Sequence, residues 1–272
     1  MKQLFQISTT TPAEPGQQVL AFRIGEKHCS FAITDLSGTK LYQLAYYSAD
    51  RMDEGSLMNL FVAHPELNNS FHKVLVSYDY PQAVLTPLQH YKYEDAQLLL
   101  KTMHGVNGKT AIASEPIVEW QIYNVYAVPE KVYEWLNKKF PVGKYWHNYT
   151  LAVKNITGTD TAGGLWIDFR KDDFTLIAAK ENKLLLAQTF LYSTPVDVIY
   201  YLLKICQQFS LSQQEVKLAV SGLIDKESAL YKELYQYFLN TEFNDANWNI
   251  SGNTEYPAHF FKSLNDLSQC AS

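Results

Sequence analysis

The sequence predicts an α/β protein built from two similar halves. Three strands, a helix and a fourth strand follow one another in the same order twice along the 272 residues. In both copies the fourth strand is a short continuous apolar run, "KVLVS" at 73–77 and "VKLAVS" at 216–221. Such runs are typical of buried parallel strands. The length also suits about two domains, at roughly 150 residues each.

The first half opens with three strands, expected at residues 19–25, 28–34 and 40–47. Asp35-Leu-Ser-Gly38 between the second and the third suits a hairpin loop, because glycine readily adopts positive φ. A helix is expected over 53–64, where apolar residues recur at helical spacing, and Pro65 ends it. Residues 1–17 precede these strands, and their Thr-, Pro- and Gln-rich part predicts a flexible N-terminal tail.

A small α/β insert is expected at residues 79–128, after the fourth strand of the first half. Its expected elements are an extended piece at 83–86, a helix at 94–104 and strands at 110–119 and 121–128. The main domain then resumes with a helix at 133–140, so that the first domain spans residues 18–150.

The second domain, residues 151–272, repeats the pattern with strands at 165–169, 173–179 and 184–192. The next helix has clear start signals: Thr194 is a capping residue, Pro195 suits the first helical position, and Asp197 lies at the positive end of the helix dipole. After the strand at 216–221 we expect a helix at 227–240, a short strand at 247–250 and a last helix at 257–267.

Composition excludes several functional classes. The net charge is −5 and no run of Lys and Arg is present, which argues against nucleic acid as a partner. No stretch of 18 apolar residues occurs, so no membrane span is expected. Three scattered cysteines fit a reducing compartment, and we expect a cytoplasmic protein. No metal-ligand spacing and no nucleophile elbow is found, so we predict neither catalytic residues nor a metal site.

This order of elements resembles the actin-like ATPase fold, in which two ribonuclease-H-like domains face each other across a nucleotide cleft. The insert after the fourth strand is similar to that of the FtsA and PilM branch, which serves cell division and pilus assembly. The stretch "VYAVPEKVYEWLNKKFP" also looks like the strand and helix that follow that insert. The chain looks closest to an uncharacterised bacterial family of pilus-assembly-like proteins. The resemblance covers nearly all of residues 18–270 and rests on element order.

The resemblance implies a phosphate-binding hairpin with the pattern D-x-G at the start of each half. The first hairpin here reads Arg23-Ile-Gly25, so the glycine remains and the acid is replaced by a base. The second reads Asp168-Phe-Arg170, so the acid remains and the glycine is replaced.

The glycine-rich adenosine loop of the family would fall at Val220-Ser221-Gly222-Leu223-Ile224, where a single glycine is left.

These departures predict a degenerate nucleotide cleft. Magnesium requires oxygen ligands, and Arg23 replaces one of them with a cation. We therefore expect a pseudo-ATPase that does not hydrolyse ATP efficiently and that needs no cofactor, with ATP as the one remaining candidate. Because the two hairpins face each other in this fold, Arg23 and Asp168 are expected either to pair or to point separately to solvent or local carbonyls.

Four tyrosines flank the insert: Tyr78, Tyr80, Tyr91 and Tyr93. If exposed, they would form a partner surface; otherwise they pack between the insert and the domain, which is common for tyrosine. In the resembled pilus-assembly proteins, a short peptide of the partner docks near this insert. The resemblance thus implies an unidentified protein partner.

Three functions remain open at this point. The first is a non-catalytic binding or scaffold protein with an assembly role. The second is an ATPase-like protein that holds phosphate through Arg23 and Arg170 without metal, since arginine pairs well with phosphate. The third is an enzyme of unrelated chemistry, for which the sequence offers no constellation of residues.

Overall fold

The computed structural model describes all residues except 10–15, 107, 157–158, 251–254 and 271–272. The chain divides into two compact units. The first contains Met1–Leu151 with Asn247–Thr254 and Leu264–Ser272, and the second contains Ala152–Ala246 with Glu255–Ser263.

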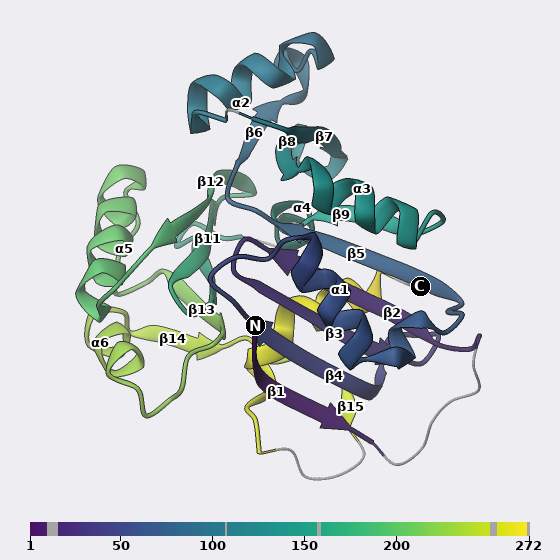
Figure 1. The fold of residues 1–272 in the computed structure, drawn as a ribbon. Helices are drawn as coiled ribbons and strands as arrows, with labels where there is room; N and C mark the ends of the chain where they lie inside the picture. The colour runs from purple at the N-terminus through teal and green to yellow at the C-terminus, as the bar shows by residue number, and fades with distance from the viewer. Residues whose placement is uncertain (10–15, 107, 157–158, 251–254, 271–272) are drawn as a thin grey trace. The chain divides into compact units, whose positions relative to one another are not determined.

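A seven-stranded sheet forms the first unit, in the order β1-β4-β3-β2-β5-β9, with β15 also pairing with β4 (Figure 1). Its strands are β1 (Lys2–Ser8), β2 (Val19–Gly25), β3 (His28–Thr34), β4 (Lys40–Ser48), β5 (Lys73–Asp79), β9 (Lys144–His147) and β15 (Asn249–Ile250). Strand β2 is antiparallel to β3 and parallel to β5. This places the first hairpin and the end of β5 side by side.

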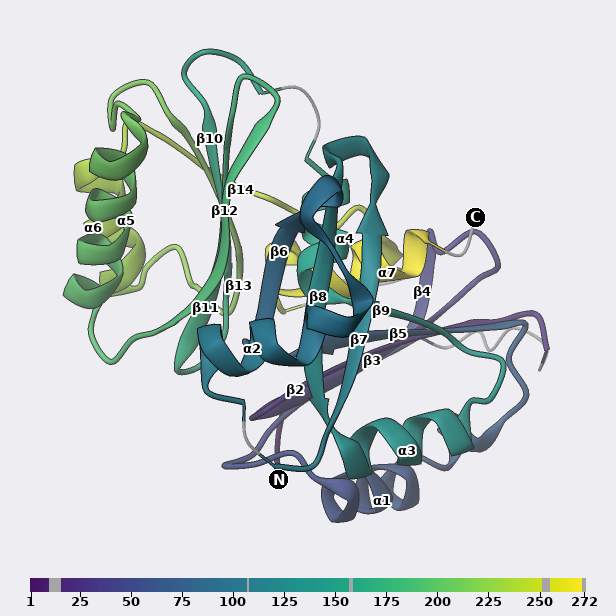
Figure 2. The same cartoon turned by 90° about the horizontal axis from the view of Figure 1, so that it is seen from above.

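Helices α1 (Glu54–Ala63) and α3 (Glu130–Lys139) lie next to each other on one face of this sheet (Figure 2). The ring of Phe61 on α1 lies 6.2 Å from that of Phe22 on β2 and 4.9 Å from that of Trp135 on α3. Because side chains alternate along a strand, Arg23 next to Phe22 points to the opposite face. Helices α4 (Asn148–Lys154) and α7 (Lys262–Gln269) cross the boundaries of the units: α4 belongs to the first unit up to Leu151, and α7 belongs to it from Leu264 onward.

The insert forms a three-stranded antiparallel sheet, β6-β8-β7, with one helix. Its elements are β6 (Ala83–Pro87), α2 (Ala96–His104), β7 (Thr110–Ile117) and β8 (Ile122–Pro129). A small apolar core built on Leu100, Val125 and Ala127 joins α2 to the sheet. The expected extended piece, helix and two strands of the insert are all confirmed.

The second unit is a five-stranded sheet in the order β12-β11-β10-β13-β14, with helices α5 and α6 on one face (Figure 2). Its elements are β10 (Gly164–Phe169), β11 (Asp173–Lys180), β12 (Lys183–Leu191), α5 (Pro195–Phe209), β13 (Lys217–Gly222), α6 (Ala229–Tyr237) and β14 (Asn240–Phe243). The predicted start of α5 is confirmed, because Thr194 and Asp197 form a reciprocal capping box.

The repeat predicted from the sequence is confirmed at the level of strand pairing. Strand β10 is antiparallel to β11 and parallel to β13, as β2 is to β3 and β5. Arg23 lies opposite Ser77 on β5, and Asp168 lies opposite Ser221 on β13. The two hairpins therefore occupy equivalent places in two domains of common topology.

Two expectations about the ends of the chain are wrong. Residues 2–8 are not part of a flexible tail: they form β1, which pairs antiparallel with β4. A register shift between Gln3 and Phe5 interrupts the alternation that would have revealed this strand. The second domain does not keep all of residues 151–272, because β15 and α7 from Leu264 onward belong to the first unit. There Trp248 donates to the carbonyl of Gly38 at 3.0 Å.

Candidate functional site

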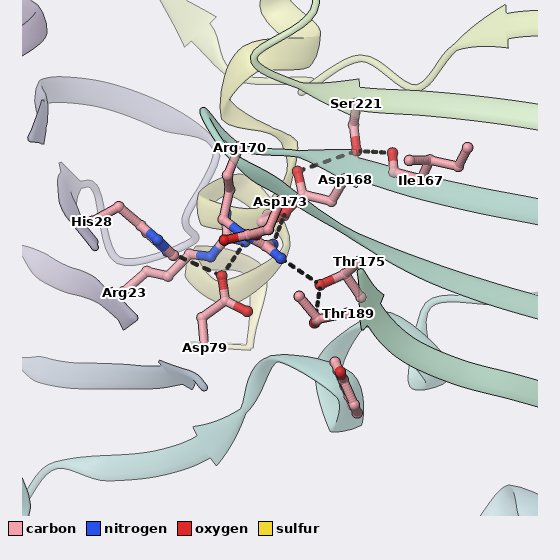
Figure 3. A network of polar contacts seen from close by, with 12 residues as sticks. Arg23, His28, Asp79, Ile167, Asp168, Arg170, Asp173, Thr175, Thr189 and Ser221 are labelled. Atoms are coloured by element: carbon pink, nitrogen blue, oxygen red, sulfur yellow. Dashed lines mark hydrogen bonds and ion pairs between the residues drawn. The ribbon is translucent and has the colours of Figure 1, made fainter. Parts of the chain in front are cut away.

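Arg23 is buried in the first hairpin and paired with an acid of its own unit. It lies on β2 between Ser30 of β3 and Ser77 of β5, and is 4% exposed. Its Nη2 lies 2.6 Å from Oδ2 of Asp79, the last residue of β5 (Figure 3). A charge this deep in the protein requires such a partner, because an unpaired buried ion is strongly destabilising.

Gly25 is needed in this hairpin because the imidazole of His28 lies against its Cα, where a side chain would otherwise begin. His28, opposite Gly25 in the hairpin, places its Nε2 3.0 Å from Oδ2 of Asp79 on the far side of the glycine. A Cβ on Gly25 would lie 2.3 Å from the imidazole of His28 and 2.7 Å from the carbonyl oxygen of Asp79. The space that the resemblance reserves for an approaching phosphate is thus filled by the protein's own imidazole.

In the second hairpin, hydrogen bonds and ion pairs with side chains of the second unit hold Arg170 in place (Figure 3). It is 4% exposed, and its Nε donates to Asp173 while its Nη2 donates to Oγ1 of Thr175 at 2.9 Å. Its Nη1 lies 3.6 Å from Oδ2 of Asp168. The backbone closes the same turn, with the N–H of Arg170 bonded to the carbonyl of Asp173 at 2.8 Å. The guanidinium therefore already has two carboxylates around it.

Asp168 and Ser221 extend the network of polar contacts around Arg170. Ser263 donates to Oδ2 of Asp168 at 3.0 Å, and the hydroxyl of Ser221 donates to the carbonyl of Ile167 at 2.9 Å and lies 3.5 Å from Oδ1 of Asp168. The hydroxyls of Ser221 and Ser263 and the guanidinium of Arg170 thus lie around the Asp168 carboxylate within the second unit.

Gly222 is retained for a packing reason. Its φ is +79°, and a Cβ there would lie 2.1 Å from the carbonyl oxygen of Phe169 and 2.7 Å from Oδ1 of Asp168. The end of β13 thus approaches β10 as closely as only glycine allows. No ligand is needed to explain this glycine.

The resemblance to actin-like ATPases implies Mg-ATP, and the residues present do not fit it. The first hairpin offers a guanidinium where an oxygen ligand for magnesium is required. His28 fills the cradle beside Gly25, and the protein's own backbone fills the space beside Gly222. Within the described part of the chain, no three His, Cys, Asp or Glu side chains gather in a way that could hold a metal ion.

The sequence identified the hairpins but not the residues that close them. Asp79, His28 and Asp173 were missed as members of the site, and the Asp173 side chain is only 20% exposed and binds Arg170. One signal was present for Asp79: an acid follows the apolar run that pairs in parallel with the hairpin strand. The pairing of Arg23 with Asp168 would join the two units, and it stays a prediction.

The possible assignment of Tyr78 and Tyr80 to a partner surface is wrong, and the alternative of packing in the core holds for both. Tyr78 and Tyr80 are 0% and 2% exposed, and the ring of Tyr78 stacks 5.8 Å from that of Tyr145. They belong to the core because β5 continues two residues beyond its expected end. Tyr91 is half-buried against Tyr123, with ring centroids 4.0 Å apart. Tyr93 is 76% exposed and remains available to a partner.

Two adjoining hollows lie where the insert meets the sheet of the first unit. Their volumes are about 440 and 340 Å³, and both are lined by Arg51, Met52 and Pro129. Tyr80 lines the smaller hollow, and its buried hydroxyl has no hydrogen-bond partner among the described residues. Lys109 and the start of α3 line the larger one. This region combines space, charge and an unsatisfied hydroxyl.

The buried side chain of His147, next to this region, predicts that the stability of the protein depends on pH. The imidazole of His147 is fully buried; its Nδ1 accepts from the N–H of Tyr149 at 3.1 Å, so its Nε2 carries the proton given to the carbonyl of Tyr80 at 2.8 Å. Burial lowers the pKa of His147 to about 4, although the bond to Tyr80 and the charge of Asp79 oppose this.

The unfolded chain binds a proton at the ordinary histidine pKa of 6.5, whereas the folded chain resists protonation until about pH 4. The stability is therefore complete above pH 6.5 and is lost as the pH falls toward 4, by up to about 3 kcal/mol. Urea unfolding at pH 7.5, 6 and 5 should show this slope. The loss of stability with falling pH should be smaller in His147→Gln. It should persist in His72→Gln, because His72 is exposed in the wild-type chain. An unchanged slope in His147→Gln would contradict the assignment.

Comparisons with known proteins identify the family of the chain. A protein-family model described as "Protein of unknown function (DUF3822)" matches residues 7–241. No curated protein matches the chain. Among the described residues, no helix combines the length and apolar character that crossing a membrane requires.

Two solved structures are similar over almost their whole length. One is a Bacteroides thetaiotaomicron VPI-5482 protein with an actin-like ATPase fold and unknown function, at 21% identity and a TM-score of 0.77, covering 94% of this chain and 97% of that one. The other is a PilM-PilN type IV pilus biogenesis complex, at 12% identity and a TM-score of 0.63, covering 94% and 99%. The predicted actin-like ATPase fold and its likeness to PilM are confirmed.

Proposed function

Because the chain belongs to the DUF3822 family and has the actin-like ATPase fold, we propose that it is a non-catalytic binding protein whose nucleotide hairpins are degenerate. The observation that carries the proposal is the pairing of Arg23 with Asp79 and of Arg170 with Asp173. Each hairpin residue that departs from the ATPase pattern is buried and bonded to an acid. The hairpins are thus stabilised by the protein itself rather than by a nucleotide.

The proposed ligand of this protein is another protein, in an assembly role. PilM, which shares the fold, is found in a complex with PilN. In this chain the hollows lined by Arg51, Met52 and Pro129 adjoin the insert, and they offer a concave surface with a buried hydroxyl at Tyr80. An extended peptide that contacts Arg51, Met52 and Pro129 fits this concave surface.

The second function, phosphate held by Arg23 and Arg170 without metal, is less well supported. Phosphate binding by arginine uses free N–H groups in a fork. Here Nη2 of Arg23 is engaged by Asp79, and both Nε and Nη2 of Arg170 are engaged by Asp173 and Thr175. A nucleotide would have to displace buried carboxylates to reach them.

Phosphate release from ATP tests the non-catalytic proposal. The purified chain with Mg²⁺ and ATP is expected to release phosphate no faster than the Arg170→Ala variant does. Equal background rates are the predicted result, because Arg23 lies where an oxygen ligand for the metal is required. Turnover by the wild-type chain that disappears in Arg170→Ala would contradict the proposal and favour an ATPase that uses this arginine.

A further inference from the structure

The turn that follows α3 presents an apolar side chain at its tip. Pro141 and Val142 form the centre of this turn, and the N–H of Gly143 donates to the carbonyl of Phe140 at 2.9 Å. The hydroxyl of Tyr145 donates to the same carbonyl, also at 2.9 Å. Val142 is nevertheless 92% exposed. Hydrogen bonds thus hold the turn in a shape that keeps a valine in the solvent, where it adds nothing to the core.

A second exposed valine belongs to the same end of the first unit. Val62 lies near the end of α1, the helix next to α3 (Figure 2), and is 81% exposed. The ring of its neighbour Phe61 lies 5.9 Å from that of Phe140, the residue that opens the turn of Val142. The ends of the two helices therefore each expose a valine, and neighbouring exposed apolar side chains mark an interaction site more often than single ones do.

Three lysines accompany these valines. Lys138 and Lys139 end α3, and Lys144 begins β9. Lys138 and Lys144 are exposed, whereas Nζ of Lys139 lies 5.0 Å from the ring centre of Phe61 on α1. None of the three lysines forms an ion pair with an acid in the part of the chain that the structure describes. Cations in the last turn of α3 suit its helix dipole, but Lys144 lies beyond the helix and has no such role.

The charge of this region is opposite to that of the whole chain. The net charge is −5, yet residues 135–159 contain four lysines and no acid. Two acids, Glu54 and Glu134, line a hollow of about 650 Å³ between α1 and α3, together with three lysines of α3. Glu66, which follows α1, is engaged by His64 at 2.7 Å. The balance of charge at the ends of α1 and α3 is therefore positive.

We propose that these five residues form a surface that docks on a membrane containing anionic lipids. We call it the lysine–valine surface, and it consists of Val62, Lys138, Lys139, Val142 and Lys144. The ammonium groups contact lipid phosphates, and the valines enter the boundary between headgroups and acyl chains. The hollow lined by Lys138 and Lys139 has room for a lipid headgroup.

The shape of this surface favours a membrane over an acidic protein. Val142 stands at the tip of a turn, and a bilayer receives a protruding side chain without a preformed hollow, which a protein partner would need. Attraction by a few lysines and insertion of two small apolar side chains are each weak. Acting together, they give the reversible binding that is typical of proteins that lie on a membrane.

Co-sedimentation of the full chain with vesicles tests the electrostatic part of the proposal. At low salt the wild type is expected to bind vesicles of phosphatidylcholine and phosphatidylglycerol mixed two to one, and not pure phosphatidylcholine. The double variant Lys138→Gln, Lys144→Gln should bind about 30-fold more weakly, at about fivefold for each lysine. The control Lys171→Gln, Lys226→Gln removes two exposed lysines of the second unit, has the same net charge, and should bind like the wild type.

A fluorescent label tests whether the valines reach the lipid. Val142→Cys, in a Cys270→Ser background, is labelled with a nitrobenzoxadiazole dye, since Cys29 and Cys206 are buried. The emission of the dye should increase and shift to shorter wavelength when vesicles containing phosphatidylglycerol are added, because the dye leaves water. Val196→Cys is the matched control: Val196 is also a highly exposed valine, at 68%, and its label should not respond.

Three results would overturn the proposal. One is absence of binding to vesicles that contain phosphatidylglycerol, and another is binding that the double variant Lys138→Gln, Lys144→Gln retains in full. The third is binding that requires these lysines but leaves the dye at position 142 unchanged. That result would mean that the valines do not enter the lipid, and it would favour an acidic protein as the partner of this surface.

Discussion

Arg23→Ala is expected to lower the free energy of unfolding by about 3–5 kcal/mol, the usual cost of removing one partner of a buried ion pair. Asp79, left without Arg23, would be a buried carboxylate that is 2% exposed in its side chain. His28 lies 3.0 Å from the same oxygen and neutralises it less well than a guanidinium 2.6 Å away. Denaturant unfolding followed by circular dichroism measures the loss.

A surface ion pair provides the control for this prediction. Nζ of Lys217 lies 2.6 Å from Oε1 of Glu242, at the same separation as the Arg23 pair, but both side chains are more than half exposed. Lys217→Ala should cost less than about 1 kcal/mol. The double variant Arg23→Leu, Asp79→Leu should be more stable than Arg23→Ala, because no charge is left buried. If Arg23→Ala costs no more than Lys217→Ala, the buried pair is not formed in solution.

Gly222→Ala is expected to destabilise the second unit by about 3 kcal/mol or more. Two effects add up. A φ of +79° is unfavourable for alanine by about 1–2 kcal/mol. In addition, the new Cβ would meet backbone atoms of Phe169 at 2.1 and 2.6 Å, and backbone atoms cannot rotate away. The same unfolding assay measures the loss.

Gly105→Ala separates the two effects. Gly105 ends α2 with a φ of +61°, and nothing lies within 4 Å of a Cβ built there. Its substitution should therefore show the conformational cost alone, about 1 kcal/mol. If Gly222→Ala costs no more than Gly105→Ala, strands β10 and β13 do not approach each other as closely as described.

Much of the fold follows from local patterns that a single sequence displays. The apolar runs at 73–77 and 216–221, the capped start of α5 and the turn residues predicted the repeated strands and helices. Strand β9 was missed because four residues, KYWH, show no usable alternation, and its pairing with β5 is decided by tertiary structure. Strand β14 was missed, and its first residue, Asn240, was included in the expected helix 227–240, because α6 ends three residues earlier, at Tyr237.

The residues of the candidate site were also predicted only in part. Arg23, Gly25, Asp168 and Arg170 were found because the repeat aligns the two hairpins. Their partners were not, because contacts such as Arg23 with Asp79 connect residues far apart in the chain. Such contacts depend on strand register, which hydrophobic periodicity alone does not determine.

Isothermal titration calorimetry with ATP tests the central claim most directly. Buried arginines and an imidazole occupy the hairpins, so titration of the full chain with millimolar ATP should show no saturable binding, with Mg²⁺ or with a chelator. Saturable binding that requires Mg²⁺ would contradict the claim, because it would mean that the hairpins still organise a metal–nucleotide complex.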